Sequence, residues 1–185
     1  MARTRVLVVD DERDMLDVCS DVLGKLPDVD LQVETQGARA LERLGNETFD
    51  LLLTDVRMPR VGGLELVRAA RERDPQTAIL VFTAYPSVES AVEAMKLGAN
   101  DYIAKPFLPD DLLRVASRLL EARRLRDENQ LLERHLERDY GFEEILGTSA
   151  PMLGVFETIR RGAEMEADVL IIGETGAGKE PVARS

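Results

Sequence analysis

The sequence predicts an α/β fold: a doubly wound, five-stranded parallel sheet with helices on both faces, followed by a long helical extension. Short apolar segments rich in β-branched residues alternate with amphipathic segments of helical period, as buried parallel strands alternate with helices. Proline and glycine residues stand in the connections between these segments. Charged residues directly follow several of the apolar segments, which is where open α/β sheets bind ligands.

The apolar segments have the length of buried strands, and we expect them at residues 5–9, 31–35, 49–54, 78–83 and 101–104. Between them, apolar residues recur at helical spacing, so each helix presents one apolar face that the sheet should bury. The predicted faces are Met15, Val18, Cys19, Val22 and Leu26 in the first helix, Leu64, Val67 and Ala70 in the third, and Val88, Ala91, Val92 and Met95 in the fourth.

Length and composition narrow the class of protein. The 185 residues, 44% of them hydrophobic, suffice for one globular domain with an extension. The net charge of −11 argues against a nucleic-acid-binding surface, which needs a basic patch. Cys19 is the only cysteine, so no internal disulfide can form. With no apolar run of membrane-spanning length, we expect a cytoplasmic protein with no membrane partner.

Charged residues follow three of the predicted strands. Asp10 and Asp11 come after the first predicted strand, Asp55 follows the third, and Lys105 follows the fifth. Parallel strands gather their carboxyl ends at one edge of a sheet, so these side chains should meet. Three close carboxylates repel one another unless a hard cation such as Mg²⁺ neutralises them, and the lysine adds a second positive charge. Asp55 could then attack a phosphorus atom as a nucleophile.

Each of these residues also has an ordinary structural interpretation. An aspartate after a strand is most often a helix cap or turn former, and an isolated lysine is usually solvated. The joint pattern favours a phosphoacceptor site.

Residues 4–120 resemble the receiver domain of two-component response regulators. The acidic pair, the segment DVRMPRVGG that begins at Asp55, the Thr83-Ala84 pair and the segment KPF at Lys105 occur in that family's order and intervals. The resemblance implies a flavodoxin-like strand order of 2-1-3-4-5 and a receiver domain over residues 1–120.

The resemblance also implies roles for individual residues. Asp55 would accept a phosphoryl group from a sensor histidine kinase. The Mg²⁺ ligands would be Asp10, Asp11, Asp55 and the backbone carbonyl of Arg57. Thr83 and Lys105 would bind phosphoryl oxygens, and Tyr102 would swing inward once Thr83 has moved. A cis peptide bond would join Lys105 to Pro106.

A helical pattern without a breaker runs from residue 112 to about 139, which is long for a globular helix. It predicts a coiled-coil linker over residues 121–141. The seam has Asn129 at an a position together with Val115, Ala122 and Leu136, and Leu125 and Leu132 at d positions. A buried Asn at one a position favours a two-stranded assembly, so we expect a homodimer formed through a receiver face and this linker. The alternative is a single helix packed on its own receiver domain.

Residues 142–185 have a different character. A predicted helix over residues 155–165 and a strand over 168–173 lead into Gly173, Gly178 and Lys179, which match a phosphate-binding loop. Glu180 replaces the usual Mg²⁺-binding Ser or Thr. With the segment EEILGTSAPM, this resembles the start of the AAA+ ATPase domain of NtrC-type activators of sigma-54 RNA polymerase.

The chain ends six residues after Lys179. We therefore expect the nucleotide site to be vestigial here, and binding of ATP, sigma-54 RNA polymerase and DNA to depend on domains outside this sequence. The preferred interpretation is a non-enzymatic response regulator. The alternative is a Mg²⁺-dependent phosphohydrolase with an aspartyl-phosphate intermediate, or a P-loop nucleotide-binding protein. Hydrolases of the haloacid dehalogenase type place D-x-D after their first strand, whereas this chain has adjacent aspartates there.

Overall fold

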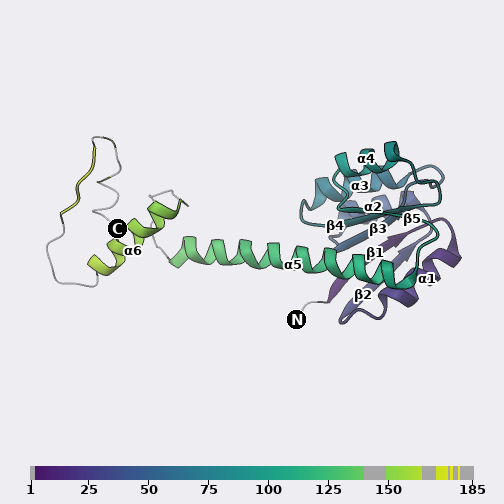
Figure 1. The fold of residues 1–185 in the computed structure, drawn as a ribbon, viewed down its shortest axis with the longest axis horizontal. Helices are drawn as coiled ribbons and strands as arrows, with labels where there is room; N and C mark the ends of the chain where they lie inside the picture. Colours follow the sequence, from purple (N-terminus) through teal and green to yellow (C-terminus); the bar gives the residue numbers. More distant parts are fainter. Residues whose placement is uncertain (1–2, 140–148, 164–169, 175, 177–178, 180–185) are drawn as a thin grey trace. The chain divides into compact units, whose positions relative to one another are not determined.

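The computed structural model describes residues 3–139, 149–163, 170–174, 176 and 179. The chain divides into two compact units, Met1–Asp127 and Glu128–Ser185. Within the described residues, five parallel strands form one sheet in the order β2-β1-β3-β4-β5 (Figure 1), as predicted. The strands are β1 (Thr4–Val9), β2 (Val29–Glu34), β3 (Leu51–Asp55), β4 (Ala78–Thr83) and β5 (Asp101–Ala104).

Helices cover both faces of the sheet. They are α1 (Arg13–Leu23), α2 (Gly37–Asn46), α3 (Gly63–Arg73), α4 (Val88–Lys96) and α5 (Pro109–Asp139). Side chains alternate across the strands, so β1, β3 and β4 supply residues to both cores. One core joins the sheet to α1 and α5, and the other joins it to α2, α3 and α4. The predicted doubly wound fold is confirmed.

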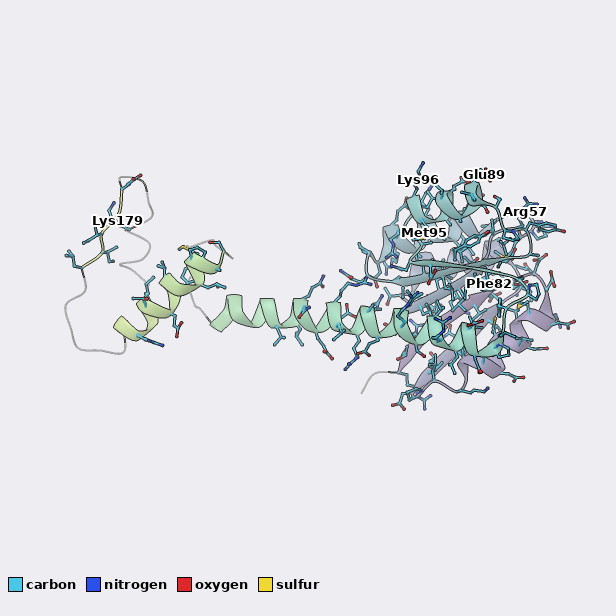
Figure 2. The ribbon with its side chains drawn as sticks, in the orientation of Figure 1. Arg57, Phe82, Glu89, Met95, Lys96 and Lys179 are labelled. Atoms are coloured by element: carbon cyan, nitrogen blue, oxygen red, sulfur yellow. The ribbon has the colours of Figure 1, made fainter. Side chains whose placement is uncertain are left out.

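The prediction that the sheet buries the apolar face of α4 was wrong for the larger residues of that face. Val88 is 76% exposed, Val92 and Met95 are also exposed, and Ala94 is the buried residue of this helix. Figure 2 shows Glu89, Met95 and Lys96 at the surface of the receiver unit. The inward side of α4 carries Ser90 and Ala94, whose small side chains let the helix approach the sheet. The larger apolar residues are therefore left outside.

The face predicted for α1 was right in part. Cys19 and Val22 are buried there, but Val18 is exposed, and Leu16 and Leu23 complete the buried surface. In α3, Val67 and Ala70 are buried as predicted, together with Leu66.

The long helix predicted at the end of the receiver is present as α5, which has 31 residues. Its first turns pack Leu112, Val115, Ala116 and Leu119 into the core. Val115 therefore cannot belong to an intermolecular seam, contrary to the predicted register. Leu125, Asn129 and Leu132 are exposed, and the side chain of Leu136 lies outside the described residues. The dimeric coiled coil stays a prediction.

The second unit contains the predicted helix, as α6 (Ala150–Ala163). The predicted strand is absent from residues 170–174, where Leu170 is 83% exposed and Ile172 is similarly open. A strand needs a neighbour for its backbone hydrogen bonds, and none pairs with this segment in the part of the chain that is described. None of the described helices has the length and apolarity needed to cross a bilayer.

Candidate phosphoacceptor site

Two carboxylates meet at the carboxyl edge of the sheet because their strands are parallel neighbours. The register pairs Val9 of β1 with Thr54 of β3, so Asp10 and Asp55 occupy equivalent positions one residue later. Asp10 is fully buried and Asp55 is 5% exposed. Two buried acids side by side are costly unless something compensates their charge.

Lys105 provides that compensation. Its Nζ lies 2.5 Å from Asp10 Oδ2 and 3.1 Å from Asp55 Oδ1. The lysine follows β5, and the Lys105-Pro106 peptide bond is cis, as the resemblance implied. Its Nζ also lies 4.9 Å from the centroid of the Phe82 ring, within the range of a cation–π contact. Sequence reasoning missed Phe82, since an aromatic at a strand end does not reveal which cation it faces.

Backbone amides fix the other oxygen of each carboxylate. The Glu12 N–H donates to Asp10 Oδ1 over 2.9 Å, and the Arg57 N–H donates to Asp55 Oδ2 over 2.7 Å. Each acid is thus held between one backbone donor and Lys105. These contacts fix the orientation of the Asp55 carboxylate.

Burial and neighbouring charges shift the pKa values of Asp10 and Lys105. Desolvation raises the pKa of Asp10 above its ordinary value, and the hydrogen bond and attraction from Lys105 only partly offset this effect. Desolvation alone would lower the pKa of Lys105, but its bonds and attraction to Asp10 and Asp55 outweigh burial and raise it. Lys105 is therefore a fixed positive charge at neutral pH.

Thr83 and Tyr85 form one side of the site. Thr83 is buried at the end of β4, and its Oγ1 accepts a hydrogen bond of 3.3 Å from the Tyr85 N–H. The Tyr85 ring is exposed and lies under the Arg57 guanidinium, with Cζ 4.9 Å from the ring centroid. Arg57 and Tyr85 therefore contact each other while their backbones hold Asp55 and Thr83.

Tyr102, on β5, is half-buried and reaches α4. Its hydroxyl oxygen lies 3.0 Å from Ser90 Oγ. Ser90 and Ser87 form the capping box that begins α4. Tyr102, which is predicted to swing inward, is thus linked to the first turn of α4. Sequence reasoning missed Ser90, although a serine three residues after another at a helix start is a signal for a cap.

The predicted metal ligands are brought together only in part. Asp11 is exposed beside the buried Asp10. Among the described residues, no group of three carboxylate, imidazole or thiol side chains is arranged to hold a metal ion. The two buried carboxylates, Asp10 and Asp55, are nonetheless oxygen donors of the kind that Mg²⁺ prefers.

The predicted nucleotide-binding residues lie in the second unit. Lys179 Nζ donates to the backbone oxygens of Gly173, over 2.9 Å, and Glu174, over 2.6 Å. Gly178 lies outside the described residues.

Comparison with known families finds two matches. Residues 6–117 match the response regulator receiver domain, and residues 145–185 match the sigma-54 interaction domain. The chain is 38% identical to the response regulator protein PilR of Pseudomonas aeruginosa over 188 residues, covering all of this chain and 39% of PilR. The chain thus spans about two fifths of the length of that curated relative.

Solved structures agree with these matches. A CheY-like receiver domain protein from Methanospirillum hungatei JF-1 aligns with a TM-score of 0.64 and 30% identity, over 68% of this chain and 99% of that one. NtrX from Brucella abortus aligns with a TM-score of 0.64 and 32% identity, over all of this chain and 40% of NtrX.

Proposed function

Because the chain belongs to the response regulators, with a receiver domain and the start of a sigma-54 interaction domain as in NtrC-type activators, we propose that Asp55 accepts a phosphoryl group from a sensor histidine kinase. The observation that carries the proposal is the bridge from Lys105 to the buried Asp10 and Asp55. It leaves a pre-oriented carboxylate beside a fixed cation, as an attacking group needs.

The transfer would be a displacement at phosphorus. A carboxylate oxygen of Asp55 forms the new P–O bond while the P–N bond to the donor imidazole breaks, and the electron pair of that bond leaves with the imidazole nitrogen. Negative charge spreads over the phosphoryl oxygens in such a transition state. Lys105 stabilises that charge, and the Thr83 hydroxyl donates a hydrogen bond to one of the oxygens.

Mg²⁺ is the ion proposed for the same site. Asp10, Asp11, Asp55 and the Arg57 carbonyl would hold it, and when bound it would offset charge on the phosphoryl oxygens. In this role, Asp10 must share its oxygens between the ion and Lys105.

The signal would leave the site through α4. Phosphorylation adds about −1.5 to −2 charge beside Thr83. Movement of Thr83 toward the phosphoryl group would open space for the Tyr102 ring, which then leaves Ser90. Since Ala94 is the one buried residue among those of α4, little packing holds this helix in one arrangement. The output would be control of a sigma-54-dependent ATPase domain, which would bind ATP. Contacts with sigma-54 RNA polymerase and DNA would be made by domains outside this sequence.

Replacement of Asp55 by asparagine tests the proposal. With a small-molecule phosphoryl donor and Mg²⁺, we expect the intact mass of the natural chain to rise by one phosphoryl group and that of Asp55→Asn to stay unchanged, because an amide is a poor nucleophile. Asp101→Asn is the matched control, since Asp101 pairs with Arg118 at the surface. An equal gain in mass for Asp55→Asn and Asp101→Asn would refute the assignment of Asp55 as the phosphoacceptor.

The proposed dimer is tested by a charge in its seam. Leu132→Asp places a carboxylate at a d position, where it would be buried in a coiled coil, so we expect the dimer to dissociate at least about tenfold more readily. Leu131 is also exposed but lies off the seam, so Leu131→Asp carries the same charge as a control. Light scattering over a concentration series gives the dissociation constants. Equal constants for the two variants would exclude the predicted seam.

A further inference from the structure

Arg123 lies on α5 beyond the last turns that pack into the receiver core. Leu119 belongs to that core and Leu120 packs against it. One turn later Arg123 is only 13% exposed, which is unusual for an arginine and calls for compensation of its charge. It also lies outside residues 6–117, so the match to the receiver family assigns it no role.

Carboxylates from two connections of the receiver surround the Arg123 guanidinium. Arg123 Nη2 donates to Asp74 Oδ2 over 3.0 Å, and Asp74 directly follows α3 as its C-cap residue. Arg123 Nε lies 3.1 Å from Asp50 Oδ1, just before β3, as an ion pair whose N–H is not aligned for a hydrogen bond. Arg123 Nη1 donates to the Phe49 carbonyl over 3.4 Å. Asp127, one turn along α5, lies 3.5 Å from Nε.

Both partner carboxylates are held in place by backbone donors. The Arg5 N–H donates to Asp50 Oδ2 and the Gln76 N–H donates to Asp74 Oδ1. Each acid therefore keeps one oxygen for the receiver backbone and presents the other to Arg123. Such a fixed pair of acceptors orients a planar guanidinium, which a lysine could not match.

The contacts of Arg123 lie far from the phosphoacceptor site within the receiver. Asp50 and Asp74 precede β3 and β4, so the contact lies at the amino edge, opposite the phosphoacceptor site. The compact receiver unit ends at Asp127, one turn beyond Arg123. We infer that Arg123, Asp50 and Asp74 form a clamp that holds α5 on the receiver as far as Asp127, beyond the last helix residues that pack into the core.

Hydrogen exchange of the full chain, without a phosphoryl donor, tests the clamp separately from the proposed phosphorylation. In Arg123→Gln, which keeps a good helix former, we expect amides of residues 121–127 to exchange at least about tenfold faster than in the natural chain. Amides of β3 should be unchanged. Arg124→Gln removes the same charge from the adjacent residue, whose guanidinium pairs with the exposed Glu121, and should change exchange less than about twofold.

Equal exchange over residues 121–127 in Arg123→Gln and Arg124→Gln would overturn the clamp. Should Arg123→Gln fail to fold, Asp74→Asn provides a second test, because asparagine still accepts from the Gln76 N–H but loses the charge that faces Arg123. Faster exchange at residues 121–127 in Asp74→Asn would support the clamp, and unchanged exchange there would refute it.

Discussion

Replacement of Lys105 by methionine is expected to destabilise the receiver by about 3–5 kcal/mol at neutral pH, because it leaves a buried carboxylate without its partner. Asp10 is fully buried, and Lys105 is its ion-pair partner in the described structure. Methionine nearly keeps the length and apolar stem of lysine, so the loss reports the charge. Denaturant unfolding measures it. Lys96→Met, at the exposed surface of α4, is the matched control and should change stability by less than about 0.5 kcal/mol.

The stability lost in Lys105→Met should become smaller as pH falls. Burial already raises the pKa of Asp10, and removal of Lys105 raises it further. A carboxyl group with a raised pKa in the folded state binds a proton more tightly there than in the unfolded chain. Stability of Lys105→Met should therefore increase relative to the natural chain as pH falls from neutral toward the ordinary Asp pKa.

At high pH the natural chain should lose the stability that Lys105 provides. The pKa of Lys105 is raised, so its stabilisation is complete below the ordinary lysine pKa and is lost as pH rises through the higher folded value. A stability difference between the natural chain and Lys105→Met that is the same at every pH would contradict the buried ion pair.

Replacement of Gly63 by alanine is expected to be the second large effect, a loss of about 1–3 kcal/mol or more. Gly63 begins α3 directly against the phosphoacceptor strand. A Cβ there would lie 2.0 Å from the backbone oxygen of Asp55 and 2.9 Å from Thr54 Oγ1. These are strand atoms in the sheet centre, so relief requires α3 or the end of β3 to move. We therefore expect a lower rate of phosphoryl gain together with the lost stability.

Gly45 supplies the contrast within the same chain. It lies in α2, and an added Cβ would meet nothing within 4 Å. Gly45→Ala should stabilise by about 0.4–1 kcal/mol, since alanine loses less backbone entropy in a helix. Thermal unfolding of the two variants should thus move in opposite directions. A neutral or stabilising Gly63→Ala would show that the described contact of α3 with β3 is wrong.

The sequence predicted the sheet and the meeting of Asp10, Asp55 and Lys105 because topology alone decides both. Strand composition gave the elements, and parallel strands end at the same edge. Helix periodicity was less informative for α4. It identified Val88, Val92 and Met95 as an apolar stripe, but periodicity does not say whether a stripe faces the sheet or the solvent.

The contacts of Arg123 could not be predicted from the sequence. The clamp at Arg123 depends on Asp50 and Asp74, which sit in connections whose geometry is not encoded by any local pattern. The predicted strand near Gly173 failed for a related reason. Its apolar residues have strand character, yet a strand forms only where a neighbour is present to accept and donate its hydrogen bonds.

Locating the phosphoryl group within the chain tests the account most directly. After incubation with a phosphoryl donor and Mg²⁺, reduction by borohydride converts an aspartyl phosphate to homoserine, and fragment masses identify the residue. We expect the reduced residue to be Asp55, with none formed when Mg²⁺ is withheld. Homoserine at Asp10 or Asp11, or no reduced residue at all, would contradict the assignment of Asp55 as the phosphoacceptor.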